Sequence, residues 1–173
     1  PQDATSGDTE KITFSYVAKK VFTNPIAITI AIAEFCTGLV RKGFEEWFPR
    51  YMQEVHHLEL SSPVFQRNAF AVVIAGIAGA FIAGFMSDKV FKSRRPPVAF
   101  IGYVLQIISL AIVTLAPSLE AIIIAFTVNS LAISMVHSML SGTASMDFGG
   151  KRAAATAAGM FDGMQYVGGS VMG

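Results

Sequence analysis

The chain has 173 residues, of which 53% are hydrophobic and only 14% are charged, and its mean hydropathy is +0.53. This composition excludes an ordinary soluble domain. The net charge is +1 and the charged residues are confined to short segments between apolar runs, so the chain has no basic patch of the kind that binds nucleic acid. Cys36 is the single cysteine, so no internal disulfide can form.

The apolar runs predict an all-α polytopic membrane protein with about five spans, each close to the length that crosses about 30 Å of hydrocarbon. The spans cover about residues 24–48, 66–86, 96–117, 120–146 and 152–173. The chain opens on Pro1 without a signal peptide and ends on Gly173 inside an apolar run, which predicts a piece of a longer protein. Residues 23–173 are therefore expected to form part of a larger transmembrane unit.

Lys and Arg are unevenly divided between the two sets of connections, which must lie at opposite membrane surfaces. One set carries nine of these residues: Lys11, Lys19, Lys20, Lys89, Lys92, Arg94, Arg95, Lys151 and Arg152. The other set carries the remaining four: Arg41, Lys42, Arg50 and Arg67. The excess predicts that the first set is cytoplasmic, and that residues 1–22 form a cytoplasmic linker feeding the first span.

Small residues recur every fourth position in two spans and predict surfaces for close helix packing. In the second span they form two adjacent rows, Gly76, Ala80 and Gly84 beside Ala75, Gly79 and Ala83. In the fifth span the row is Ala155, Gly159 and Gly163, followed by Gly169 and Gly173.

Two strings are more specific than hydropathy. The first runs from Gly84 through Asp88 and Lys89 to Arg94 and Arg95, and it resembles the loop signature that follows the second helix of each half in the major facilitator superfamily. The second places Arg41, Gly43, Trp47, Pro49 and Tyr51 in the spacing R-x-G-x-x-x-W-x-P-x-Y, with Tyr166 and two glycines downstream. Together they are similar to the organophosphate:phosphate antiporters, which include glycerol-3-phosphate and hexose-phosphate transporters.

This resemblance covers nearly the whole chain from about residue 24 and implies helices seven to eleven of twelve, in the second six-helix half. It implies exchange of a phosphorylated sugar or glycerol for inorganic phosphate by alternating access, without a cofactor, in the inner membrane. The transporter is expected to be monomeric, with the remaining residues contributed by an absent N-terminal half. Two alternatives stay open: a membrane sensor of an external sugar phosphate, and a facilitator of another organic anion.

Arg41 has two interpretations. If the first helix stops near it, the side chain reaches the interface or pairs with Glu45 four residues on. If the helix continues to Pro49, Arg41 is embedded and needs a polar cavity or a counter-charge. A phosphate ester supplies that charge, and a guanidinium can bind two of its oxygens. The resemblance implies the second role, with a partner Arg in the other half.

Four further residues are candidates for substrate binding. Glu34 lies seven residues before Arg41 on the same face, and it either neutralises Arg41, couples a proton, or bonds a Ser or Thr nearby. Asp162 lies mid-span and is expected to face the substrate cavity, with Tyr166 one turn on; the resemblance places Tyr166 near the substrate. His137 either serves phosphate or protons, or makes a helix-to-helix hydrogen bond.

The basic loop also has two interpretations. Asp88 is expected to accept charge-assisted bonds from its basic neighbours or to cap a helix end, which would latch one conformation. The alternative is a solvated loop that serves orientation only.

No enzyme motif is found: His56 and His57 lack the partners of a metal site, and no Walker loop or nucleophile elbow occurs. Gly38, Met135 and Ala144 stand where glycerol-3-phosphate transporters typically carry tyrosines and a histidine. These departures put glycerol 3-phosphate itself in doubt as the substrate.

Overall fold

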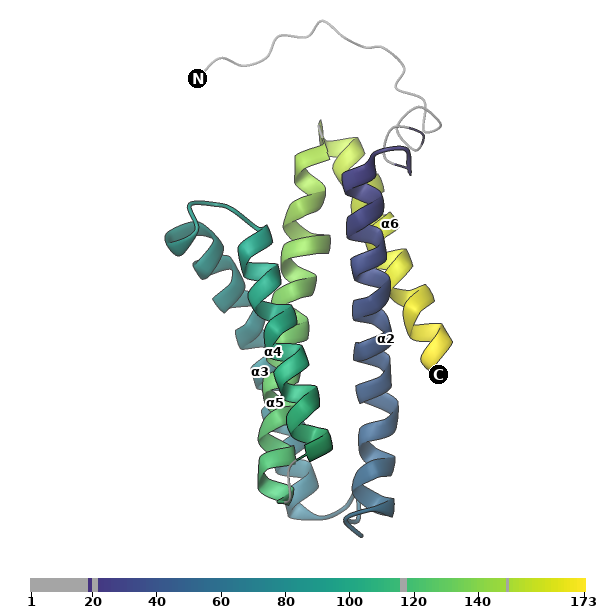
Figure 1. The fold of residues 1–173 in the computed structure, drawn as a ribbon, viewed down its shortest axis with the longest axis vertical. Coiled ribbons are helices and arrows are strands. Elements are labelled where there is room, and N and C mark those ends of the chain that lie inside the picture. Colours follow the sequence, from purple (N-terminus) through teal and green to yellow (C-terminus); the bar gives the residue numbers. More distant parts are fainter. Residues whose placement is uncertain (1–18, 20–21, 116–117, 149) are drawn as a thin grey trace, which may run out of the picture.

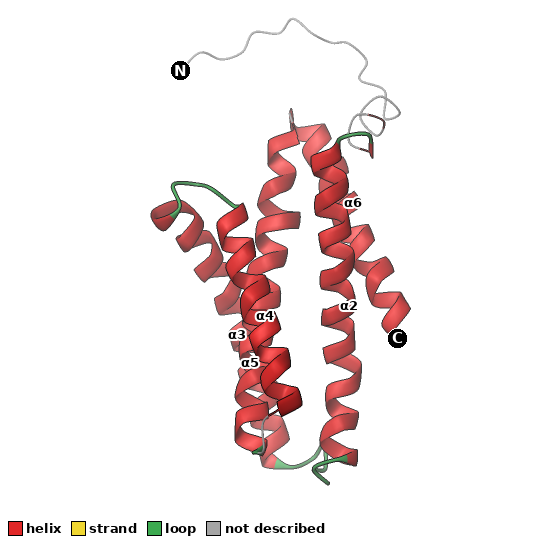
Figure 2. Cartoon of the chain, viewed as in Figure 1, coloured by secondary structure: helices red, strands yellow, loops and turns green. Residues whose placement is uncertain are grey.

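The computed structural model describes residues 19, 22–115, 118–148 and 150–173, and these residues form helices joined by short connections (Figures 1 and 2). The long helices are α2 (Pro25–Glu54), α3 (Pro63–Phe85), α4 (Pro96–Leu115), α5 (Leu119–His137) and α6 (Gly150–Met172). A π-helical turn, Met86–Val90, extends α3, and two further turns, Ser138–Thr143 and Ala144–Phe148, extend α5. Most of the predicted linker 1–22 lies outside the described residues.

Each helix start follows from local sequence. Asn24 caps α2 by accepting a hydrogen bond from the Ile26 amide, and Ser62 caps α3 in the same way through the Phe65 amide. Proline follows both caps, at a position where no backbone donor is needed. These caps fix where α2 and α3 begin.

Helix α2 is longer than the sequence predicted. Pro49 lies inside the helix, which continues to Glu54 and reaches 30 residues, whereas the span was expected to end near residue 48. A proline removes one backbone hydrogen bond, but spanning helices tolerate it where neighbouring groups compensate. The consequence is that Arg41 lies in the interior of a continuous helix.

Three helices in the described part of the chain are long and apolar enough to cross a membrane: Pro63–Val90, Pro96–Leu115 and Leu119–Met146. Helices α2 and α6, with 30 and 23 residues, have the length but carry more polar and charged side chains. The chain is therefore a multi-pass membrane protein whose spans differ in polarity.

The connections alternate between the two ends of the bundle (Figure 1). The start of α2, the loop after α3 and the junction of α5 with α6 lie at one end, and the α2–α3 connection lies at the other. This grouping is the one on which the charge count depends. That the first end faces the cytoplasm stays a prediction.

The helices pack as two groups. α3 and α4 both lie against α5, while α2 packs chiefly against α6. The row Ala75, Gly79 and Ala83 is buried, and a Cβ added to Gly79 would overlap the carbonyl of Leu131 on α5. The predicted close packing of α3 is confirmed for this row.

Among the described residues, the small-residue row of α6 makes close contacts only in its second part, where Gly169 and Gly173 lie against Lys42 of α2. A Cβ at Gly159 or Gly163 would meet nothing within 4 Å. The close approach of α6 to α2 instead uses Gly168, which faces the carbonyl of Phe35, and Gly38, which faces the carbonyl of Gln165. The period of four was correct for the buried row of α3, whereas in α6 it held for Gly169 and Gly173 but not for Gly159 and Gly163.

Candidate functional site

Arg41 lies near the middle of α2, about 24 Å along the helix from Pro25 and about 20 Å from Glu54 at 1.5 Å per residue. Its Nε donates to Glu45 Oε1 at 2.9 Å, and one terminal nitrogen donates to Gln165 Oε1 at 3.4 Å. The structure combines features of the two alternatives: the helix continues past Arg41, as the second requires, and Arg41 pairs with Glu45, as the first allowed. A partly exposed guanidinium at this depth retains donors for a ligand.

Gly38 determines what lies between Arg41 and Glu34. These three residues share a face of α2, and α6 crosses that face with the backbone of Gln165 against Gly38. Any side chain at residue 38 would overlap the Gln165 carbonyl. The absence of a Cβ thus admits α6 at the one level where its Gln165 side chain can reach both charged residues.

Gln165 bridges the two charges. Its Nε2 donates to Glu34 Oε2 at 3.2 Å and lies 3.1 Å from His137 Nδ1, while its Oε1 accepts from Arg41. Glu34 is completely buried, so a carboxylate there depends on such donors. Glu34 and Arg41 are therefore linked through an amide and not in direct contact.

His137 and Asp162 extend this cluster towards α5. His137 Nδ1 lies 3.6 Å from Glu34 Oε2, and its Nε2 lies 3.9 Å from Asp162 Oδ1. Ser141 donates a hydrogen bond to the same Asp162 oxygen. If Gln165 Nε2 donates to Nδ1, the neutral imidazole carries its proton on Nε2, facing Asp162. We call Glu34, Arg41, His137, Asp162 and Gln165 the polar cluster.

A cavity of ≈ 540 Å³ opens beside the polar cluster, between α2, α3 and α5. Arg41 and His137 line it together with Glu45 and with Asn129, Ser130 and Ser134 of α5. The remaining lining is mostly apolar, with Phe44 and Phe48 from α2. A cation paired with a carboxylate, an imidazole and several neutral polar groups in an otherwise apolar cavity suit a small polar ligand, with the guanidinium as the group that would bind an anion.

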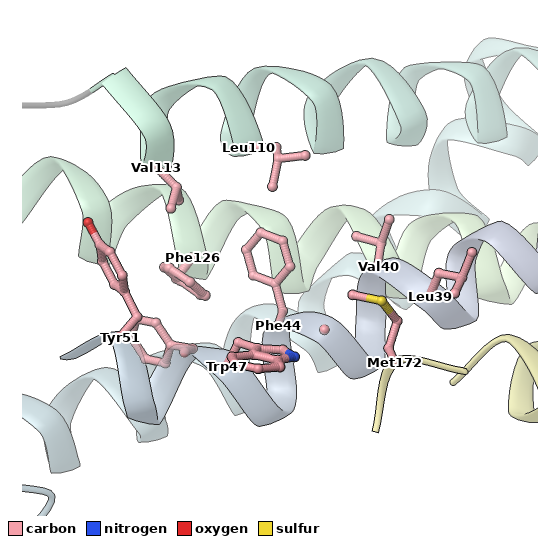
Figure 3. Close-up of a pocket in the computed structure, with 11 residues that line it drawn as sticks. Leu39, Val40, Phe44, Trp47, Tyr51, Leu110, Val113, Phe126 and Met172 are labelled. Carbon is pink, nitrogen blue, oxygen red and sulfur yellow. The ribbon is translucent and has the colours of Figure 1, made fainter. Parts of the chain in front are cut away.

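A second cavity, of ≈ 390 Å³, is almost entirely apolar (Figure 3). Its lining includes Phe44 and Trp47 of α2, Leu110 and Val113 of α4, and Phe126 of α5 (Figure 3). Phe126 also packs against Phe44 and Phe48, with ring centroids 4.6 and 3.6 Å apart. This aromatic packing joins α2 to α5, and the cavity has no group that would hold a phosphate.

Tyr166 does not join the polar cluster. Its residue surface is 74% exposed, whereas Gln165, one position earlier, is buried in the cluster. Tyr166 lines a separate hollow of ≈ 300 Å³ with Arg41, Lys42 and Glu45. This hollow and the ≈ 540 Å³ cavity have Arg41 and its partner Glu45 in common. A role of Tyr166 at the substrate stays a prediction.

The predicted latch lies in the π-helical turn and the loop that follows. Gly84 ends α3 without a close neighbour, and Asp88, Lys89 and Arg94 are exposed. Lys92 and Ser93 have φ of 52° and 64°, and the Ser93 amide donates to Ser87 O at 2.7 Å. The Arg95 carbonyl accepts from Val98 and Ala99 at the start of α4. Within the described residues no hydrogen bond or ion pair of the Asp88 carboxylate is found, so latching stays a prediction.

Sequence reasoning missed Gln165 and Ser141. Gln165 lies three residues after Asp162, on the same helix face, and Ser141 lies in the π-helical turn that extends α5. A polar residue three positions from an intramembrane carboxylate was the available signal. Which of Gln165 and Tyr166 turns inward depends on the crossing of α6 over Gly38, which one sequence does not reveal.

Comparisons with known proteins agree with this architecture. A family model described as the Major Facilitator Superfamily matches residues 1–173. A glycerol-3-phosphate transporter of Bacillus subtilis (strain 168) is 32% identical over 164 residues, which are 94% of this chain and 35% of that protein. A glycerol-3-phosphate transporter of Haemophilus influenzae is 28% identical over 178 residues, covering 94% and 36%.

A third relative is described differently. The membrane sensor protein UhpC of Salmonella typhimurium is 28% identical over 160 residues, covering 91% of this chain and 35% of the sensor. The chain thus spans about a third of the length of these relatives.

Proposed function

The chain belongs to the major facilitator superfamily, whose members are membrane transporters and not enzymes, and on that premise we propose that it is part of the second six-helix half of an organophosphate:phosphate antiporter. The transporter exchanges a phosphorylated organic metabolite for inorganic phosphate by alternating access, as a monomer in the inner membrane. Helices α2 to α6 are then helices seven to eleven of twelve, and residues 1–22 lie in the cytoplasm.

One observation carries the proposal: Arg41 lies mid-helix and lines the same ≈ 540 Å³ cavity as His137. An Arg at this depth is costly unless it faces a cavity or a counter-charge. Its pairing with Glu45 and Gln165 satisfies part of the guanidinium in the absence of ligand. A phosphate dianion would accept two hydrogen bonds from the guanidinium at once. It carries more negative charge than the Glu45 carboxylate, so it would replace Glu45 as the partner of Arg41.

The test is phosphate exchange by the complete transporter in proteoliposomes with Arg41→Lys and Arg41→Ala. Loss of the two charge-assisted bonds should lower exchange by roughly 100-fold, and Lys should fail nearly as badly as Ala because an ammonium lacks the planar fork. Lys42→Ala is the matched control, because Lys42 pairs with Glu46 in the same helical turn but does not line the ≈ 540 Å³ cavity.

Phosphate exchange by Arg41→Lys at the wild-type rate would contradict the assignment of Arg41. An equal loss in Lys42→Ala would mean that the helix as a whole, and not the cavity cation, had been disturbed.

A sensor is the second candidate function, favoured by the relative described as a membrane sensor protein. Binding of the phosphorylated compound would look the same in a sensor and in a transporter. Uptake of labelled compound into vesicles separates them, since a sensor binds without net uptake. Transport of another organic anion is separated by competition, because inorganic phosphate should compete only where the site accepts phosphate.

A further inference from the structure

Asn129 is a buried amide without a hydrogen-bond partner. The residue lies on α5 and is 1% exposed. Neither Nδ2 nor Oδ1 has a partner among the described residues. Leaving both ends of an amide unsatisfied inside a protein costs free energy that a hydrophobic side chain would avoid. Such a residue is a candidate for binding a ligand.

Asn129 lines the same ≈ 540 Å³ cavity as Arg41 and His137, so a ligand in that cavity can reach the amide. His137 lies eight residues further along α5, about 12 Å at 1.5 Å per residue and roughly two turns away. Ser134, between them, adds a hydroxyl to the same wall. The cavity therefore combines the Arg41–Glu45 ion pair with an imidazole and several neutral polar groups of α5.

We propose that Asn129 binds a hydroxyl group of the organic part of the substrate while Arg41 holds its phosphate. A hydroxyl both donates and accepts, as the two unsatisfied amide atoms require. The ligand class is then a phosphorylated compound with at least one hydroxyl on its body, and the inference rests on the proposed function. Inorganic phosphate has no organic body, so its contact with Arg41 does not require Asn129.

The test compares Asn129→Leu with wild type in the complete transporter, using two competitors of phosphate exchange. Glycerol 3-phosphate carries hydroxyls, and propyl phosphate has a similar length without them. In the wild type glycerol 3-phosphate should compete more strongly. Asn129→Leu should remove about 10-fold of that advantage, because only glycerol 3-phosphate carries the hydroxyl that the amide would bind.

Thermal unfolding gives a readout that does not depend on transport. Without ligand, Asn129→Leu should unfold at a higher temperature than wild type, because an unsatisfied buried amide is replaced by an apolar side chain of similar size. Asn68→Leu is the matched control: Asn68 is also buried, but its Oδ1 accepts from Thr127 at 3.5 Å and it does not line the cavity. Asn68→Leu should leave the ranking of the two competitors as in the wild type.

Two results would overturn the inference while leaving the proposed function in place. One is an unchanged ranking of the two competitors in Asn129→Leu, and the other is a lower unfolding temperature, which would mark Asn129 as a residue bonded to another part of the protein. A wild-type transporter without any phosphate exchange would instead overturn the proposed function, and the inference with it.

Discussion

The two helix groups use close packing for different purposes. In the group of α3, α4 and α5, the helices are long and apolar and meet through small residues such as Gly79. In the pair of α2 and α6, a glycine also permits close approach at Gly38, but the contact there positions Gln165 between Glu34 and Arg41. Close packing is thus a scaffold in one group and a means of assembling charged residues in the other.

The difference teaches where function lies in this molecule. Intramembrane charges are expensive and persist only where they are paired or face a cavity. Four of the five members of the polar cluster come from α2 and α6, and the fifth, His137, ends α5 where it meets both. The apolar group supplies the opposite wall of the cavity through Asn129 and its neighbours on α5.

The largest expected effect comes from Gly38→Ala. The new Cβ would overlap the Gln165 backbone, which cannot move without separating α2 from α6. We expect a loss of about 3 kcal/mol in stability, at the upper end for overpacking, and loss of transport, measured by thermal unfolding in detergent and by exchange assays.

Gly159→Ala is the control for this change. A Cβ at Gly159 meets nothing within 4 Å in the described part of the chain, so its effect should stay within about 0.5 kcal/mol. Equal tolerance of both substitutions would show that the crossing at Gly38 does not determine the packing of the pair.

A smaller loss is expected from Gln165→Leu. The change leaves Glu34, completely buried, without its amide donor and removes one acceptor of Arg41. We expect about 2 kcal/mol of destabilisation, the cost of an unsatisfied buried group, and a phosphate-exchange rate that falls with it.

Gln106→Leu is the matched control, because it removes a buried amide from the apolar helix group. Gln106 is buried on α4, in the apolar group, and its Nε2 has no partner among the described residues. Its replacement should be neutral or mildly stabilising. If Gln165→Leu were equally harmless, the amide bridge would contribute nothing and the distinction between the groups would fail.

Asp162→Asn should have the smallest effect on the exchange rate. Its effect should instead appear in the pH profile or in the ranking of organic substrates. Asp162 accepts from Ser141, and its Oδ1 lies 3.9 Å from His137 Nε2. The amide should preserve phosphate–phosphate exchange while shifting its pH profile or the ranking of organic substrates, because it removes the charge next to the imidazole.

Glu120→Gln, at an exposed carboxylate at the start of α5, should change neither property. The same pH profile and substrate ranking in Asp162→Asn and wild type would make Asp162 a packing residue that serves only to bond Ser141.

The sequence alone determined the class of protein, the approximate spans and most members of the polar cluster. Apolar runs of about 20 residues indicate membrane-spanning helices, because backbone groups in lipid must form their hydrogen bonds within the helix. Charges inside those runs are rare enough that Glu34, Arg41, His137 and Asp162 stand out individually, and the spacing around Arg41 resembles that of one transporter family. None of these inferences requires knowledge of which helices touch.

Only the tertiary structure decided how these residues meet. The sequence placed Glu34 and Arg41 on one face but did not show that α6 crosses between them, because helix pairing depends on the fit of two surfaces and not on either alone. The crossing turns Gln165 inward and leaves Tyr166 exposed, and it directs Gly159 and Gly163 away from α2. Asn129, unremarkable among the residues of α5, became a candidate ligand only when its burial, its missing partners and the cavity were seen together. A side chain's chemistry is written in the sequence, but its surroundings, which set the cost of leaving it unpaired, exist only in the folded protein.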